Sequence, residues 1–455
     1  MITGDPKRAV RKLAVPMMIS MLLIMAYNLV DSVWVAGLGS DALAALGFVT
    51  PVFMILIGLG NGIGAGANSL IARNIGAKDK ENADNSAIHS LIMTLIISII
   101  APMVLLPILK NILLVMGAGS SVELGLQYGN VIFLFMIVFL FSSVGAAVLR
   151  SEGDVKRATY SMAITAILNM ILDPIFIYTL GMGMAGAAWA TIISAGISCI
   201  VIGYWIWVKK DTYLTITRDR FHYKKDIVKG ILLVAIPATI EFLAMSVLSI
   251  IMNTMLVIVG GTSAVAVYTA GFRLIQMATI PIMGFGTALL TVAGASYGSR
   301  RYDNLEIAYN YSIKLCEIMA LIMIVLIYVF ADQISIIFCY SSASVVLAPR
   351  IAQFLRIMSF FLLAMPMGVI SASTFQGVGK GTTSLILTLI RSLIFESVFA
   401  YIFGLVLGWG ETGMYIGIVI GVTLGSLVSL AWGKLFISRL KKLDEEGAKK
   451  DNYAT

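Results

Sequence analysis

Charged residues are scarce in this chain of 455 residues, since Asp, Glu, Lys and Arg together make up only 12% of it. A soluble domain carries about 25% charged and about 45–50% apolar residues. Here 59% of the residues are hydrophobic and the mean hydropathy is +0.95, which excludes a soluble globular enzyme. Disorder is excluded as well, because it needs low hydrophobicity and high charge. The composition predicts a multi-pass membrane protein.

Cysteine and histidine are too few to build a disulfide framework or a histidine metal site. Three cysteines stand apart without a C-x-x-C pair, and there are only two histidines. The chain also lacks the ATP-binding pattern G-x-x-x-x-G-K-[ST] and the H-E-x-x-H zinc pattern. We therefore expect no cofactor and no enzymatic activity. Energy for transport would have to come from an ion gradient.

Twelve apolar runs are long enough to cross a bilayer as helices of about 20–25 residues. They fall at 12–36, 43–72, 86–109, 124–149, 157–180, 185–208, 229–259, 264–296, 306–331, 347–375, 382–407 and 414–437. On the side that holds both termini we count 26 Lys and Arg residues, and only Lys110 and Arg350 lie in the opposite loops. This asymmetry predicts a cell-membrane protein with both termini in the cytoplasm, and it explains the net charge of +8 without a nucleic-acid partner.

The second half of the sequence repeats the first. VDSVWVAGLG (30–39) matches MNTMLVIVGG (252–261) at an offset of 222, and LGMGMAG (180–186) matches LGWGETG (407–413) at an offset of 227. An all-α membrane fold of two homologous six-helix bundles follows, related by an axis along the membrane normal. The predicted parts are an N-terminal lobe (1–208), a cytoplasmic linker (209–229), a C-terminal lobe (230–438) and a polar cytoplasmic tail (439–455).

Two acidic residues near the outer ends of first-half helices, Asp31 and Asp173, are the strongest site candidates. An acid at mid-bilayer costs about 2.5–3.5 kcal/mol on insertion scales, so such residues are functional candidates by default. Tyr27 lies one turn before Asp31, and Asn169 lies one turn before Asp173. Pro174 has no N–H, which frees a carbonyl one turn earlier. These oxygens predict a cradle for H⁺ or Na⁺ at Asp31, Asp173 and Asn169. The alternative is a buried polar pair that pins two helices together.

The repeat indicates that ion coupling belongs to the first half. Asn253 stands where the repeat places Asp31, and Phe399 or Ala400 stands where it places Asp173. A second-lobe cavity could still be lined by three polar residues of the second half. These are Glu241, Asn253 and Arg273.

Other residues within the spans support more than one interpretation. Pro16 lies inside the first span and predicts either a hinge that moves Asp31 or a static kink. Arg391 and Glu396 could pair across helices, and we favour a structural role for them.

The first span, with Pro16 and YNLVDSVWVAGLG (27–39), resembles the opening signature of the multidrug and toxic compound extrusion (MATE) transporters. LNMILDPIFIYTLGMGMAGAAWAT (168–191) does so too, and Asp31 with N-x-x-x-D-P (169–174) is similar to the prokaryotic DinF-like branch. The resemblance implies a V-shaped, two-lobed monomer that exports organic cations and amphipathic drugs by alternating access, in exchange for H⁺ or Na⁺. It implies a first-lobe network of Asp31, Asp173, Asn169, Tyr27 and Thr191, the last of which rests on the resemblance alone. It also implies hinges at Pro16 and Pro174.

Two other functions stay open. A flippase for lipid-linked saccharides, from the same broader superfamily, would need a cationic cavity to hold pyrophosphate. Few cations lie in the spans and none of them is in the first half, which counts against this alternative. A membrane-embedded enzyme would need a catalytic set, and the sequence contains no recognisable one.

Overall fold

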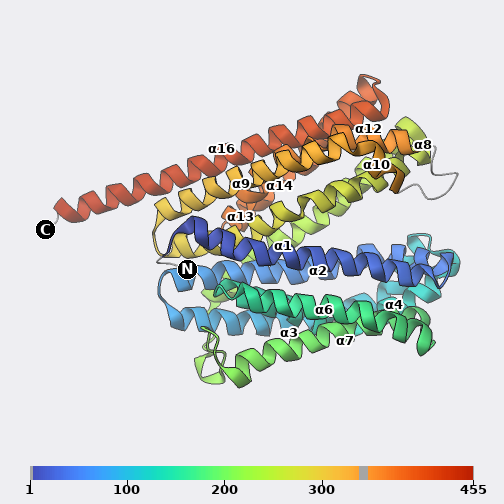
Figure 1. Cartoon of the computed structure of the whole chain (residues 1–455). Helices are drawn as coiled ribbons and strands as arrows, with labels where there is room; N and C mark the ends of the chain where they lie inside the picture. Colours follow the sequence, from blue (N-terminus) through green and yellow to red (C-terminus); the bar gives the residue numbers. More distant parts are fainter. Residues whose placement is uncertain (1–3, 338–346, 454–455) are drawn as a thin grey trace. The chain divides into compact units, whose positions relative to one another are not determined.

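The structure is a computed structural model that describes residues 4–337 and 347–453. Ten of its helices are long and apolar enough to cross a membrane, and two bent helix pairs bring the number to as many as twelve. Each predicted apolar run corresponds to one of these helices or bent pairs (Figure 1). The predicted all-helical membrane fold is confirmed.

The first half contains seven α-helices, two of which form a bent pair. They are α1 (Pro6–Ala36), α2 (Ser40–Gly76), α3 (Lys80–Val115), α4 (Val122–Leu134), α5 (Met136–Ser151), α6 (Val155–Pro174) and α7 (Gly183–Gly203). Short segments join them: the 3₁₀ turns η1 (Gly119–Ser121) and η4 (Arg218–Arg220), and the π-helical η2 (Ile175–Thr179) and η3 (Tyr204–Lys209).

The second half follows the same plan. Its α-helices are α8 (Lys225–Gly298), α9 (Tyr302–Val329), α10 (Ala331–Ile337), α12 (Ala348–Met358), α13 (Phe361–Gly377), α14 (Gly381–Thr388), α15 (Ser397–Tyr401) and α16 (Gly410–Tyr453). Its π-helical segments are η5 (Leu389–Glu396) and η6 (Ile402–Val406). The backbone of α8 is not helical at Gly261, so this element contains two spans, Lys225–Gly261 and Ser263–Gly298.

The backbone repeats at the offsets seen in the sequence. Lys78 and Arg300, 222 residues apart, both adopt positive φ, at 60° and 54°. Gly181 and Gly408, 227 residues apart, have φ of 65° and 68°. The segments η2 and η6 are both π-helical at the same offset. The bend between α4 and α5 is 53° and its counterpart between α12 and α13 is 48°. The two halves are therefore homologous in structure.

Contacts divide the chain into two compact units. Residues 19–242 form one, here called the N-terminal unit, and residues 1–18 with 243–455 form the other, here called the C-terminal unit. Both divisions fall inside helices, α1 and α8, so the 209–229 segment belongs with the N-terminal unit. The domain limits drawn from the sequence stay a prediction.

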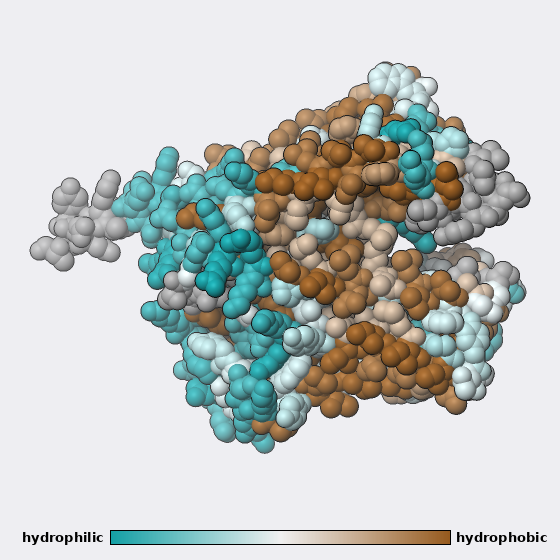
Figure 2. Space-filling model, viewed as in Figure 1, coloured by the Kyte–Doolittle hydropathy of each residue, from teal (hydrophilic) through white to brown (hydrophobic). Residues whose placement is uncertain are grey.

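Hydrophobic residues cover the middle of the helices, and hydrophilic residues gather at their ends (Figure 2). In the N-terminal unit the buried core is built from α2, α3, α4, α5 and α7, with Leu56, Leu109, Phe133 and Leu140 fully buried. Small residues bring the helices close, because helices in a bilayer associate through close packing rather than through expulsion of water. Gly186 of α7 illustrates this, since an added Cβ there would lie 2.7 Å from the carbonyl oxygen of Phe176.

The segment between α7 and α8 is docked on the N-terminal unit by side chains that accept its backbone N–H groups. Thr215 N donates to Asp84 Oδ1 at 2.9 Å, and Leu214 N donates to Glu152 Oε2 at 2.9 Å. Nearer α8, Lys224 N donates to His89 Nε2 at 3.4 Å. Leu214 itself is buried. The predicted linker is thus an ordered part of this unit.

Candidate functional site

The predicted acids lie deep in the N-terminal unit. Asp173, on α6, is 0% exposed, and Asp31, on α1, is 8% exposed. Asn169 and Thr191 are buried beside them, on α6 and α7. Three helices thus bring four polar side chains into an apolar interior, and each side chain must find its partners within the protein.

Asn169 is the centre of this polar cluster. Its side-chain Nδ2 donates to Asp173 Oδ1 at 3.2 Å and to Thr191 Oγ1 at 3.2 Å. The Thr191 hydroxyl in turn donates to the Ala187 carbonyl at 3.1 Å. Because both Asn169 donors are used, its orientation is fixed and its own oxygen faces away from these bonds. The structure therefore brings Asn169, Asp173 and Thr191 together as the sequence predicts.

The local backbone changes its winding directly after Asp173. Pro174 has no N–H to donate to the Met170 carbonyl, and Ile175 N bonds to Leu172 O instead. The chain then continues as the π-helical η2, in which Leu180 N donates to Ile175 O at 2.8 Å. Such interruptions of an α-helix occur mostly at functional sites. Pro174 is thus the point at which regular α-helical bonding ends beside the acid.

The two carboxyl groups interact directly, since Asp31 and Asp173 lie within hydrogen-bonding range of each other. Three oxygens around them are buried without a hydrogen-bond partner, namely Asp31 Oδ1, Asn169 Oδ1 and Asp173 Oδ2. Two adjacent carboxylates cannot both stay charged in an apolar site, so a proton or another cation must neutralise one of them. The oxygen set fits a hard cation as well as a proton.

Tyrosine side chains complete the cluster. Tyr27 lies close enough to interact electrostatically with both Asp31 and Asp173. Tyr128, on α4, is buried within reach of both acids, and its hydroxyl lies within hydrogen-bonding range of Thr191. The sequence analysis missed Tyr128. The available signal was a phenol inside the apolar run 124–149, which by itself does not indicate the direction in which the ring points.

The other predicted residues are not gathered into one site. By its contacts Glu241 belongs to the N-terminal unit, whereas Asn253 and Arg273 belong to the C-terminal unit, where Arg273 is exposed. Pro16 lies within α1, which is continuous from Pro6 to Ala36. The hinge role of Pro16 and the predicted second-lobe cavity stay predictions.

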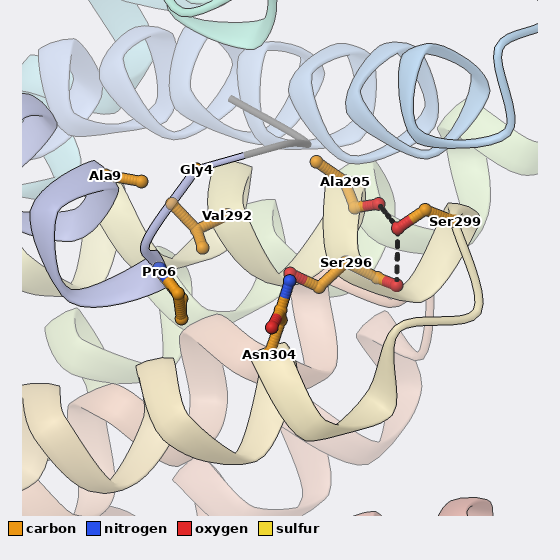
Figure 3. A pocket seen from close by; sticks show the side chains of 8 residues that line it. All are labelled: Gly4, Pro6, Ala9, Val292, Ala295, Ser296, Ser299 and Asn304. Carbon is orange, nitrogen blue, oxygen red and sulfur yellow. Dashed lines mark hydrogen bonds between the residues drawn. The ribbon is translucent and has the colours of Figure 1, made fainter.

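A small cavity in the C-terminal unit is separate from these residues. Its volume is about 10 Å³, which is room for about one water molecule. Figure 3 shows that its walls are small side chains from the N-terminal segment, α8 and α9. They are Gly4, Pro6, Ala9, Val292, Ala295, Ser296, Ser299 and Asn304. The Ser299 hydroxyl already donates to backbone carbonyls at 2.9 Å and 3.1 Å, so this cavity is a packing gap.

Known proteins resemble the chain over most of its length. The family model described as MatE matches residues 16–175 and 237–402. A multidrug resistance MATE family transporter of the MOP superfamily, solved in an outward-facing conformation, is 43% identical, with a TM-score of 0.94 over 96% of this chain and 97% of that one.

Two further relatives differ in what is said of their function. A MOP superfamily transporter from Pyrococcus furiosus is 42% identical, with a TM-score of 0.94 over 97% of this chain and 98% of that one. The reverse polarity of its binding pocket is said to suggest a different function. The multidrug export protein MepA of Staphylococcus saprophyticus is 27% identical over 385 residues, which is 83% of each chain.

Proposed function

The chain belongs to the MatE family of multidrug and toxic compound extrusion transporters, and from this premise we propose that it exchanges drugs for cations. Its membership makes it a membrane transporter and not an enzyme. The proposed substrates are organic cations and other amphipathic drugs, as the name of the staphylococcal relative suggests. The proposed coupling ion is H⁺ or Na⁺, bound in the N-terminal unit.

One observation carries the proposal: three buried oxygens of Asp31, Asn169 and Asp173 have no hydrogen-bond partner. A buried acceptor without a donor costs about 1–3 kcal/mol, and more when it is charged. A bound cation or proton removes this cost, so the site favours occupation. Because the two acids interact directly, their titration belongs to the pair.

The residues would act as follows. With the pair charged, the site attracts a cationic substrate to its side of the membrane protein. When an external cation neutralises the pair, this attraction is lost and α1, which carries Asp31, repacks against α6 and α7. The ion drives export only if it binds the two conformations unequally. Asn169 and Thr191 hold Asp173 in place in both.

The same proposal places both termini in the cytoplasm, since 26 of the Lys and Arg residues lie on that side. A reporter that folds only in the cytoplasm, fused to the C-terminus, should be active in intact cells. An inactive reporter on an expressed, membrane-inserted fusion would reverse the topology.

Transport in proteoliposomes tests the function. Ethidium efflux is measured with an imposed pH gradient or an imposed Na⁺ gradient, on the wild type and on Asp31→Asn and Asp173→Asn. We expect one gradient to drive efflux in the wild type and neither to drive it in the variants. Glu306→Gln is the control, because Glu306 pairs with Lys441 at 2.6 Å, away from the site.

Two results would contradict the proposal. Wild-type efflux by Asp31→Asn would remove the acids from coupling. No ethidium movement with either gradient, in a folded wild type, would favour a different cargo such as a lipid-linked saccharide, and the Pyrococcus furiosus relative shows that such a divergence has been considered within this superfamily.

A further inference from the structure

The C-terminal unit buries its own pair of ionisable residues, Arg391 and Glu396. They are 5% and 3% exposed. Both lie on η5, so they do not pair across helices as the sequence analysis suggested. Neither belongs to the polar cluster described above, which lies wholly in the N-terminal unit.

The π-helical winding of η5 places Arg391 and Glu396 on the same side. In an α-helix, residues five apart point about 140° away from each other. In a π-helix the backbone bonds run from residue i to residue i+5, which stacks residues five apart nearly above one another. The two side chains therefore face a common region, and Arg391 exerts an electrostatic influence on Glu396.

One side of this region is closed by bare backbone. Gly417, Gly421 and Gly425, each one turn apart on α16, press directly on the segment. An added Cβ would lie 2.4 Å from the Phe395 carbonyl oxygen at Gly421, and 2.5 Å from the Arg391 Cα at Gly425. These positions of α16 can offer no side-chain donor to Glu396.

Glu396 consequently lacks the partners that a buried carboxylate needs. In the part of the chain that the structure describes, no hydrogen bond and no ion pair involves its carboxyl group. The ionisable groups near it are Arg391 and Tyr268, a buried residue of α8. Arg391 Nε donates to Ser392 Oγ at 3.4 Å. A buried charge without hydrogen bonds is so costly that the group takes up a proton instead.

The repeat gives this position an independent meaning. Glu396 lies 227 residues after Asn169, the same offset that relates η2 to η6. Asn169 is the centre of the polar cluster in the N-terminal unit. The second half has lost the counterparts of both aspartates but has an ionisable group at this central position.

We propose that Glu396 is a second proton-binding site, located in the C-terminal unit and occupied independently of Asp31 and Asp173. The carboxyl group releases its proton to water and becomes a carboxylate, whose charge Arg391 offsets across the shared face of η5. The binding of this proton needs no assumption about transport. Its use as a coupled ion rests on the proposed function.

Infrared difference spectroscopy of the full-length protein in liposomes tests the site directly. Neutral carboxylic acids give a carbonyl stretching band that carboxylates lack, so a buried protonated glutamate appears as a band that pH titration removes. We expect Glu396→Gln to lose one such band and Asp31→Asn to alter a different one. Glu306→Gln, which removes an ion-paired glutamate, should leave both bands unchanged. An unchanged spectrum of folded Glu396→Gln would overturn the proposal.

A second variant covers the case in which Glu396→Gln does not fold. Glu396→Asp keeps an acid but shortens the side chain, so it should shift the band without removing it, and an unshifted band would overturn the site.

Transport then separates the two proposals. Under a pH gradient, we expect Glu396→Gln to move fewer protons per ethidium than the wild type. An unchanged proton-to-ethidium ratio would overturn the coupled role of Glu396. If Asp31→Asn transports normally while Glu396→Gln still loses its band, the proposed coupling site fails and the second proton site stands.

Discussion

The docked segment between α7 and α8 should loosen as the pH rises, and Glu152 is the residue that makes this measurable. Glu152 lies in the turn between α5 and α6, outside the spans, and accepts a hydrogen bond from Leu214 N at 2.9 Å. Burial raises the pKa of Glu152 from 4.5 to about 7, assisted by the nearby Asp154 and opposed by the Leu214 hydrogen bond and by Arg157.

The sign follows from proton linkage. Because the pKa of Glu152 is higher in the docked state than its ordinary value, docking binds a proton. The stabilisation is full below about pH 4.5 and is lost as the pH rises through about 7. One pKa unit is worth about 1.4 kcal/mol, so the loss is roughly 2–3 kcal/mol for this partly buried group. Local opening would become on the order of 30–150-fold more frequent.

Hydrogen exchange of the 210–220 backbone amides between pH 5 and pH 8, corrected for the intrinsic exchange rate, measures this opening. Glu152→Gln keeps an acceptor for Leu214 N but cannot ionise, so it should flatten the pH dependence and protect the segment more than the wild type at pH 8. Asp84 and His89 also accept N–H groups of the segment, so the comparison with the variant is the decisive reading.

The control is Asp211→Asn. Arg157 and Lys209 lower the pKa of this exposed carboxyl group, which therefore stays charged over the whole range and should leave the wild-type slope unchanged. Equal pH slopes in the wild type and Glu152→Gln would refute the reasoning.

Three substitutions test the packing and bonding of the two units. Thr191→Val removes the hydroxyl that Asn169 contacts at 3.2 Å, which should cost about 1 kcal/mol and slow ethidium efflux about 2–10-fold in proteoliposomes. Gly421→Ala places a Cβ 2.4 Å from a carbonyl oxygen of η5 and should lower the unfolding free energy by about 1–3 kcal/mol, seen as a lower thermal midpoint in detergent. Pro174→Ala supplies an N–H to the Met170 carbonyl, so it should raise that midpoint while reducing efflux, and unchanged efflux would argue against a role for the freed carbonyl.

Much of the fold could be predicted from the sequence because its signals are local. Runs of apolar residues set the spans, and the glycine matches set the repeat, which the positive φ angles of Gly181 and Gly408 reproduce. The candidate acids could be predicted for a similar reason: a carboxyl group within an apolar run is visible as a contrast in composition. The approach of Asn169 to Asp173 followed from the spacing of one helical turn.

What could not be predicted depends on contacts between distant segments. Tyr128 reaches the cluster only because α4 packs against α7, which no pattern in its own run reveals. The docking of the 209–229 segment depends on acceptors such as Asp84, more than a hundred residues earlier. Similarly, the distance between Arg391 and Glu396 in the sequence suggested opposite faces of an α-helix, and only the π-helical winding of η5 brings them to one side.

A change of helical winding lies beside a buried acid in both halves of the chain, and the physical reason is the same in each. A regular α-helix satisfies its own backbone groups and leaves none for a cation or a polar side chain. Where the winding changes, at Pro174 in the first half and through η5 in the second, backbone geometry departs from that closed pattern. Only the first of these uses a proline, so the two halves reach the same local condition by different residues. The repeat has therefore preserved an interruption of the helix at this depth more closely than it has preserved the acids themselves.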